Sequence, residues 1–88
     1  MKKIVFVCLG NICRSPMAEF VMKSLTDQLK IESRATSSWE HGNPIHRGTQ
    51  AIFKKYAIAY DRDKTSQQIS PADFADFDYV IGMDESNV

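Results

Sequence analysis

The sequence predicts an α/β fold with a doubly wound parallel sheet, built as a single domain over residues 1–88. Three observations support this fold. Strand-like and helix-like patterns alternate along the chain, the first strand is apolar throughout, and proline follows a capping residue at three expected helix starts. Because a strand–helix–strand alternation favours right-handed crossovers, we expect the strands to run parallel.

The first strand is expected at Lys3–Val7, a β-branched and aromatic run of the kind found in strands covered on both faces. Ser15 is expected to cap the first helix, and Pro16 suits its first position. This helix should run to about Leu29. Its expected apolar face consists of Ala18, Val21, Met22, Leu25 and Leu29.

The second strand is expected at Arg34–Ser38, and the WEHGNP segment that follows it has the composition of a loop. Asn43 and Pro44 then predict the start of a second helix. The expected apolar side of this helix carries Ala51, Ile52 and Tyr56.

The polar segment Asp61–Gln68 is expected to be a loop with a solvated surface. Ser70 and Pro71 predict a short helical turn, which should extend through Phe74 and Phe77. The third strand is expected at Asp78–Met83. The next helix should be capped by Asp84, and the charges of Asp73, Asp76 and Asp78 should be solvated.

A new helix pattern begins just before the sequence ends at Val88, so we expect the domain to be incomplete at its C-terminal end, without its last strand and helix. The third strand would then be an exposed sheet edge, and such edges pair with other chains. We therefore predict self-association, which light scattering would detect.

The composition excludes several classes of protein. The 11 basic and 11 acidic side chains give no net charge, which argues against sequence-independent nucleic-acid binding. No apolar run approaches the ~18–20 residues that span a bilayer, and we expect a cytoplasmic protein without a membrane partner. In a reducing compartment, two cysteines indicate catalytic, redox or metal chemistry more often than a structural disulfide.

Both cysteines lie in the CLGNICRSP stretch directly after the first strand. Ligands in open α/β sheets bind at the carboxyl ends of the strands, and the N–H groups of a helix start attract anions. Gly10 lets the backbone approach a bound group closely. The stretch therefore predicts a phosphate-binding loop with six contributing residues: Leu9, Gly10, Asn11, Ile12, Cys13 and Arg14.

The side chains of this loop add chemistry to the anion site. Arg14 can grip two phosphate oxygens through its planar guanidinium. A helix start beside a cation also stabilises a thiolate, so Cys8 is expected to attack phosphorus. Ser15 can donate a hydrogen bond to the sulfur as it leaves, and Asn11 can adopt a positive φ. This mechanism requires no metal and no cofactor.

These residues resemble the signature loop of the low-molecular-weight protein tyrosine phosphatases, a cysteine-dependent family with a flavodoxin-like fold. The resemblance continues through TSSWEHGNP, the segment FDYVIGMD and the final ESN motif. It implies hydrolysis of phosphotyrosine through a phosphocysteine on Cys8, with Arg14 as phosphate clamp and with Ser15 and Asn11 as its supporting network. Substrates would be phosphotyrosine proteins or small aryl phosphates, and inorganic phosphate would inhibit as product.

The resemblance also implies roles for three further residues. Trp39 and Glu40 would line the mouth of the site where a phenyl ring enters, although packing of Trp39 against the loop is an equal alternative. Cys13 would trap an oxidised Cys8 as a reversible disulfide; the other interpretation is that it only fills space behind the loop.

The sequence departs from the family pattern in two places. The family's general acid is the aspartate of an Asp-Pro pair, and no such pair occurs in these 88 residues. Because a positioned acid typically contributes ~10²–10⁴-fold, we expect this chain alone to be impaired or inactive. Lys64 and Gln67 stand where the family often carries a histidine-containing stretch.

Four alternatives remain open at this point. The cradle could belong to a non-catalytic phosphate-binding or redox-sensing module, or to an enzyme that resembles arsenate reductase. Arsenate reduction needs further cysteines, and none follows Cys13. A zinc site of Cys8, Cys13, His41 and His46 has an allowed spacing, yet the positive charge of Arg14 would lie beside the metal. The related arginine phosphatases place threonine at the position of Ile12, which instead suits an aryl group.

Overall fold

The structure is a computed structural model that describes residues 1–83. Its elements follow in the order β1 (Lys2–Cys8), α1 (Arg14–Leu25), β2 (Leu29–Ala35), α2 (Arg47–Lys55), α3 (Pro71–Asp76) and β3 (Tyr79–Gly82). The strands form one parallel sheet in the order β2-β1-β3. This topology confirms the predicted α/β fold with its parallel sheet.

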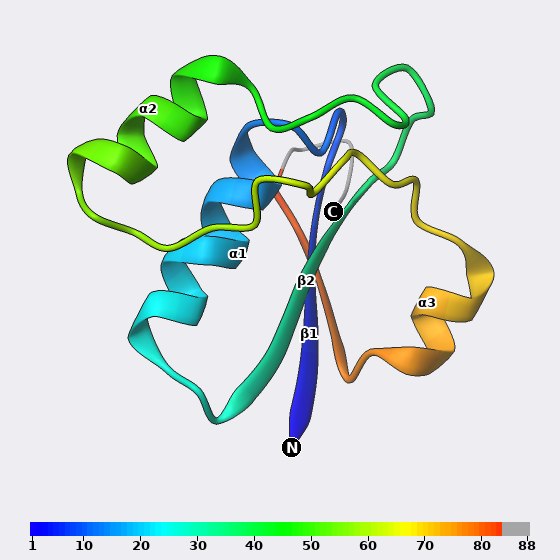
Figure 1. Cartoon of the computed structure of the whole chain (residues 1–88). Coiled ribbons are helices and arrows are strands. Elements are labelled where there is room, and N and C mark those ends of the chain that lie inside the picture. The colour runs from blue at the N-terminus through cyan, green and yellow to red at the C-terminus, as the bar shows by residue number, and fades with distance from the viewer. Residues whose placement is uncertain (84–88) are drawn as a thin grey trace.

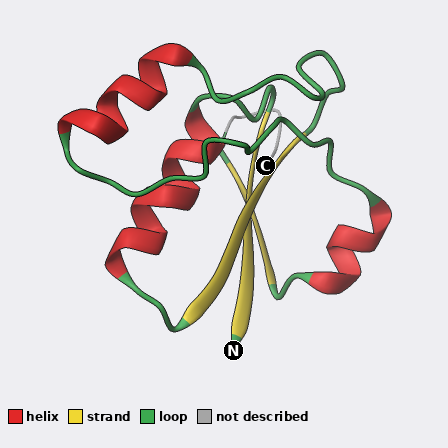
Figure 2. Ribbon diagram, viewed as in Figure 1, coloured by secondary structure: helices red, strands yellow, loops and turns green. Residues whose placement is uncertain are grey.

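The helices lie on both sides of the sheet, as Figures 1 and 2 show: α1 and α2 on one side and α3 on the other. A cluster of Phe20, Ile45 and Phe53 joins α1 to α2 and to the loop between β2 and α2. On the side of α3, Val5 and Val7 of β1 pack against Phe77. In β1 itself the four successive residues Val5–Cys8 are buried, so both faces of the central strand are covered, as its continuous apolar run predicts.

The position of β1 in the middle of the sheet decides where its carboxyl end lies. Its register runs from Lys2 opposite Leu29 to Cys8 opposite Ala35, and β3 pairs along its other edge. The loop that follows Cys8 is therefore flanked by the carboxyl ends of both neighbouring strands.

The first helix differs from its prediction at both ends. It begins at Arg14, with Cys13 as the N-cap, and it ends at Leu25. Ser15 was wrongly expected to be the cap, because its hydroxyl is hydrogen-bonded to Asn11 and Cys8. The predicted apolar face is wrong at Leu25, which is exposed, whereas Ala18, Val21 and Met22 are half-buried. The buried residues of the helix are Ser15, Pro16, Glu19 and Phe20.

The second strand covers Leu29–Ala35, so the expected range Arg34–Ser38 overlaps it only at its end. The reason lies in the side chains of an edge strand. Lys30 and Glu32 alternate with the buried Ile31 and Ser33, and this alternation places charged groups toward solvent. Leu29, expected to end the first helix, is instead the first residue of this strand.

The second helix begins at Arg47, three residues later than Pro44 predicts. His46 is its N-cap, and the Nδ1 atom of the imidazole accepts a hydrogen bond from the Gly48 N–H at 3.0 Å. The expected apolar side is wrong here too. Ala51, Ile52 and Tyr56 are exposed, whereas Thr49 and Phe53 are buried.

The third helix confirms its start at Ser70 and Pro71. Ser70 and Asp73 form a capping box, in which the Ser70 N–H donates to the Asp73 carboxylate at 2.9 Å. Asp73 is therefore buried rather than solvated as expected, while Phe77 is buried and Phe74 exposed.

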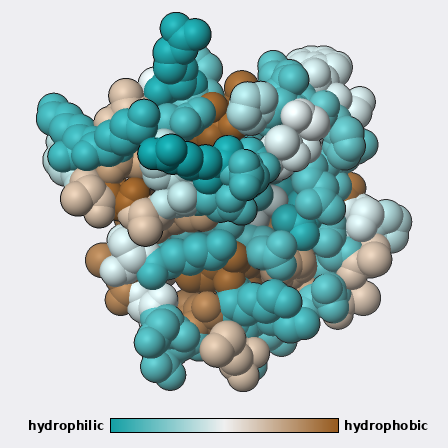
Figure 3. All heavy atoms as spheres, in the orientation of Figure 1, coloured by the Kyte–Doolittle hydropathy of each residue, from teal (hydrophilic) through white to brown (hydrophobic). Residues whose placement is uncertain are grey.

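The third strand is confirmed within its expected range, and Tyr79, Val80 and Ile81 on it are exposed. Self-association through this edge stays a prediction. The helix cap expected at Asp84 lies outside the described residues. Figure 3 shows a mainly hydrophilic face with apolar side chains between the polar ones over α1 and β2. Within residues 1–83, no helix has the length and apolar character needed to cross a membrane.

Candidate active site

The loop after β1 encloses a small cavity. Its volume is about 130 Å³, and seven consecutive residues line it, from Cys8 to Arg14. These are the residues that the sequence predicts as the nucleophile and the phosphate-binding loop. The structure brings them together at the carboxyl end of the central strand, in a space of the size of a small oxyanion.

The thiol of Cys8 forms the floor of this loop. The residue is 5% exposed, and its Sγ lies 3.2 Å from the Asn11 backbone nitrogen, whose N–H donates to it. The Ser15 Oγ lies 3.0 Å from the same sulfur. The sulfur thus accepts one backbone N–H and has one hydroxyl as its neighbour within hydrogen-bond distance.

Asn11 determines how the Ser15 hydroxyl is used. Its Oδ1 accepts from the Gln67 backbone N–H at 3.2 Å, which fixes the orientation of the amide. The Nδ2 then donates to the Ser15 Oγ at 2.8 Å. Because that oxygen already accepts a hydrogen bond, its own proton is available to the Cys8 sulfur. The predicted positive φ of Asn11 is confirmed at 55°.

Arg14 and Cys13 stand where the loop turns into α1. Arg14 is the first helical residue, and its Nη1 lies 3.5 Å from the carbonyl oxygen of Met83. Cys13 is exposed, and its Sγ accepts from the Thr49 Oγ1 at 3.2 Å. Both cysteines are free thiols in this structure. Trapping of an oxidised Cys8 by Cys13 therefore stays a prediction.

Trp39 and Glu40 occupy the loop between β2 and α2. The tryptophan is 78% exposed, so it is not part of the core. Glu40 accepts from the Asn43 Nδ2 at 2.7 Å, and a Cβ placed on Gly10 would lie 3.4 Å from the Glu40 Cγ. Glu40 thus lies beside the phosphate-binding loop, and the role of both residues at a substrate mouth stays a prediction.

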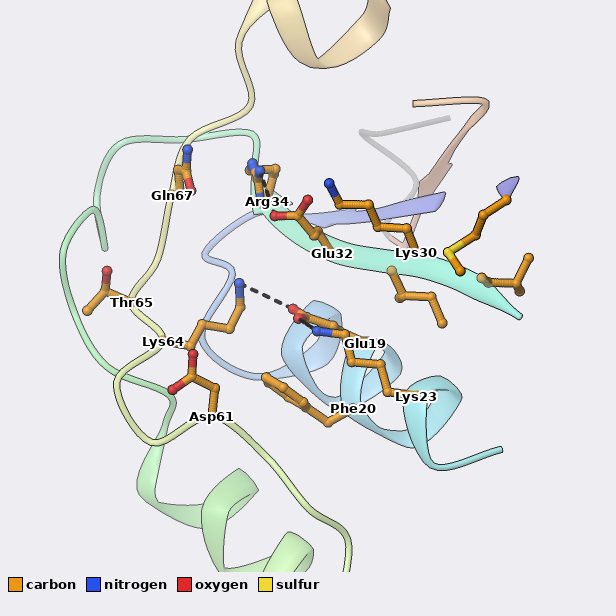
Figure 4. Close-up of a pocket in the computed structure, with 13 residues that line it drawn as sticks. Glu19, Phe20, Lys23, Lys30, Glu32, Arg34, Asp61, Lys64, Thr65 and Gln67 are labelled. Atoms are coloured by element: carbon orange, nitrogen blue, oxygen red, sulfur yellow. Dashed lines mark hydrogen bonds and ion pairs between the residues drawn. The ribbon is translucent and has the colours of Figure 1, made fainter. Parts of the chain in front are cut away.

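The sequence analysis missed a charged cluster around the buried Glu19 carboxylate. Its partners are Ser33, Lys64 and the more exposed Lys23, and Figure 4 shows the Lys64 and Lys23 side chains pointing toward the Glu19 carboxylate. Lys64 Nζ lies 3.2 Å from the Glu19 Oε1. Lys23 Nζ lies 2.6 Å from Oε2, and the Ser33 hydroxyl donates to Oε1 at 2.5 Å. Lys64 is therefore not the solvated loop residue that its polar segment predicts.

These charged residues line a cavity of about 710 Å³, larger than the one at Cys8. Most of its charged groups are already paired with one another, and it holds neither cysteine. The smaller cavity is the better candidate for catalysis, because it alone combines a nucleophile with converging donors. In residues 1–83, no three His, Cys, Asp or Glu side chains form a group that could hold a metal ion.

Known proteins resemble this chain in sequence. The model of the family described as low molecular weight phosphotyrosine protein phosphatase matches residues 3–88. The low molecular weight protein-tyrosine-phosphatase PtpA of Staphylococcus epidermidis is 50% identical over 93 residues, which cover 100% of this chain and 58% of that protein.

Solved structures agree with the sequence matches. The crystal structure of SP-PTP, a low molecular weight protein tyrosine phosphatase from Streptococcus pyogenes, has a TM-score of 0.97 and 67% identity over 99% of this chain and 59% of that one. The Drosophila arginine phosphatase DARP has a TM-score of 0.88 and 36% identity over 99% and 57%. The chain thus spans somewhat more than half the length of these relatives. It belongs to the low molecular weight phosphotyrosine protein phosphatase family.

Proposed function

We propose that this chain carries the nucleophile and the phosphate site of a protein tyrosine phosphatase that acts through a phosphocysteine. The observation that carries the proposal is the environment of the Cys8 sulfur. It is buried at the floor of the loop, it accepts a hydrogen bond from the Asn11 backbone N–H, and it lies within hydrogen-bond distance of the Ser15 hydroxyl. A neutral buried cysteine that only filled space would not need these donors.

In the first step the Cys8 thiolate attacks the phosphorus of an aryl phosphate. The sulfur–phosphorus bond forms as the bond from phosphorus to the phenolic oxygen breaks, and the electron pair of that bond leaves with the phenolate. Loop N–H groups and the Arg14 guanidinium would hold the phosphoryl oxygens, where charge is spread in the transition state.

In the second step a water molecule attacks the phosphocysteine. The sulfur–phosphorus bond breaks, orthophosphate is released, and the sulfur recovers its electron pair as a thiolate. The Ser15 hydroxyl lies 3.0 Å from this sulfur and can stabilise the leaving thiolate by donating its proton in a hydrogen bond. Orthophosphate should in turn bind the empty loop and inhibit.

The phenolate must also take up a proton as it leaves, and phenols have a pKa of ~10. The family resemblance assigns this proton to an Asp-Pro aspartate, and these 88 residues contain no Asp-Pro pair. We therefore expect the chain to hydrolyse an activated ester, whose leaving group needs no proton, better than phosphotyrosine.

An aromatic substrate is supported by the apolar groups around the loop. Leu9 is 45% exposed, Trp39 is 78% exposed, and Ile12 is half-buried in the loop itself. Tyrosine-phosphorylated proteins and small aryl phosphates fit such a mouth better than a charged phosphoguanidinium does. We place this reaction in the cytoplasm, where thiols stay reduced; cell fractionation that finds the protein elsewhere would contradict this.

The test compares p-nitrophenyl phosphate with phosphotyrosine as substrates of this chain. We expect the chain to hydrolyse the activated ester and Cys8→Ser to abolish this activity. Arg14→Lys should reduce it at least ~100-fold, because lysine cannot bind two phosphoryl oxygens in a bidentate manner. Orthophosphate should also protect Cys8 from alkylation by iodoacetamide. Activity that survives Cys8→Ser would contradict the covalent mechanism.

Other outcomes distinguish the remaining candidates. Protection by orthophosphate without turnover of either ester would indicate a phosphate-binding module. Preferential hydrolysis of phosphoarginine would indicate that the chain has the substrate specificity of an arginine phosphatase.

A further inference from the structure

Ser66 lies in the polar segment 61–68, yet only 1% of it is exposed. Its hydroxyl donates to the carbonyl oxygen of Gly10 at 2.7 Å, across 56 positions of sequence. Gly10 belongs to the phosphate-binding loop. A buried serine therefore contacts the loop through its backbone without lining the cavity.

The backbone of Ser66 is itself held in place. Its N–H donates to the Asn43 carbonyl at 2.8 Å, and its carbonyl accepts from the Gly42 N–H at 2.9 Å. With two backbone hydrogen bonds to the 42–43 turn, the segment cannot move freely with the loop. The hydroxyl is thus a fixed donor, and the Gly10 carbonyl aligns with it.

The Gly10–Asn11 peptide connects this donor to the active-site sulfur. A trans peptide is planar, and its C=O and N–H point in opposite directions. The carbonyl end of this unit is bound by the Ser66 hydroxyl. The N–H end donates to the Cys8 Sγ at 3.2 Å. Rotation of the peptide plane would break both hydrogen bonds together.

Such a rotation needs to be prevented, because Asn11 has a φ of 55°, in the left-handed region that costs a residue with a Cβ some free energy. Two adjacent residues of the 61–68 segment restrain the backbone and the side chain of Asn11. Ser66 holds the peptide that precedes it, and the Gln67 N–H holds its side-chain oxygen at 3.2 Å. Within this otherwise mostly exposed segment, Ser66 itself is buried.

We propose that Ser66 is a positioning residue for the reactive thiolate: it orients the Gly10–Asn11 peptide so that the Asn11 N–H points at the Cys8 sulfur. The proposal deepens the function proposed above, on which it rests. Ser66 touches neither the sulfur nor the phosphate cavity. Its effect passes through one peptide plane and favours the ionised form of Cys8.

The test is the pH dependence of alkylation of Cys8 by iodoacetamide in this 88-residue chain, with the label assigned between Cys8 and Cys13 by tandem mass spectrometry. For Ser66→Ala we expect alkylation at pH 6–7 to be roughly 3- to 10-fold slower, the equivalent of one hydrogen bond. The difference should vanish near pH 10, where the thiol is ionised in both proteins. A change in access alone would slow the reaction equally at every pH.

Two variants control this experiment. Ser66→Thr keeps a hydroxyl and should restore the wild-type profile, and Ser24→Ala removes an exposed hydroxyl on α1 and should leave it unchanged. Should Ser66→Ala prove unfolded by circular dichroism, Ser66→Cys replaces it, because its thiol has nearly the same size and donates weakly. It should give a smaller shift in the same direction.

A wild-type profile in Ser66→Ala, or an equal slowing at all pH values, would overturn the role of Ser66. The proposed function is tested separately by orthophosphate. If orthophosphate fails to protect the wild-type thiol, the phosphate site is wrong, whatever the variants show. If it protects while Ser66→Ala matches the wild type, only the inference on Ser66 fails.

Discussion

Ser15 and Glu19 lie on the same buried face of α1, one helical turn apart, and they bind different parts of the molecule. Ser15 contacts the phosphate-binding loop through Cys8 and Asn11. Glu19 contacts β2 and the 61–68 segment through Ser33 and Lys64. The helix therefore contacts the loop after β1 through Ser15, and it contacts β2 and the 61–68 segment through Glu19.

The two positions differ in charge. The hydrogen-bond partners of the Ser15 hydroxyl are the neutral Asn11 amide and the Cys8 sulfur. Around Glu19 a buried carboxylate is balanced by two ammonium groups. Buried charges are costly when one partner is removed, whereas neutral hydrogen bonds are weaker but directional. We thus expect Glu19 to affect mainly stability and Ser15 mainly reactivity.

The largest effect on stability is expected for Glu19→Gln. The substitution leaves Lys64, whose side chain is only 12% exposed, without its carboxylate partner. Removing one member of a buried pair costs about 3–5 kcal/mol of unfolding free energy, a large share of a small domain's stability. Urea denaturation measures this loss. If the unfolding free energy changes by less than ~1 kcal/mol while Cys8 becomes less reactive, Glu19 affects mainly reactivity, which contradicts the expectation.

A smaller loss of stability is expected for Ser15→Ala, about 1–3 kcal/mol, because the Asn11 amide and the Cys8 sulfur each lose a buried partner. The alkylation of Cys8 at neutral pH should nevertheless slow more than it does in Glu19→Gln, when both proteins are assayed folded. Ser24→Ala on the exposed side of the same helix is the matched control. Equal alkylation rates in Ser15→Ala and in the wild type would contradict the role of Ser15.

The smallest loss of stability is expected for Lys23→Met, a substitution that compares Lys23 with Lys64 as partners of Glu19. Lys23 pairs with Glu19 at i, i+4, but its side chain is 42% exposed. Such partly solvated helix pairs contribute about 0.3–0.5 kcal/mol and weaken in salt. Thermal unfolding at low and high salt measures it. A cost equal to that of Glu19→Gln would mean that Lys23, not Lys64, is the essential partner of the carboxylate.

That residues 8–14 line one small cavity could be predicted from the sequence, because these residues are consecutive. Strand, loop and helix start follow one another in nine residues, so proximity in the chain already brings Cys8, Asn11, Arg14 and Ser15 close together. The capping box at Ser70 and Asp73 is likewise local, and its helix start was predicted correctly.

The β2 strand and the faces of α1 and α2 could not be predicted in the same way. Lys30 and Glu32 have the composition of a helix surface, and only pairing with β1 makes the segment a strand. Hydrophobicity placed Val21, Met22 and Leu25 on the inner face of α1. The tertiary structure instead buries Glu19 there, because Lys64 and Ser33 neutralise and bind its carboxylate.

The sequence by itself determined which residues form the loop after the first strand, the alternation of strands with helices and the parallel sheet, since these depend on neighbours in the chain and on the period of apolar residues. Only the tertiary structure decided which distant groups hold that loop: Ser66 on the Gly10 carbonyl and Gln67 on the Asn11 side chain, each across 56 positions. Hydrogen bonds between such distant residues leave no periodic pattern in the sequence. Each needs only one donor, and its position depends on which segments the folded chain brings together.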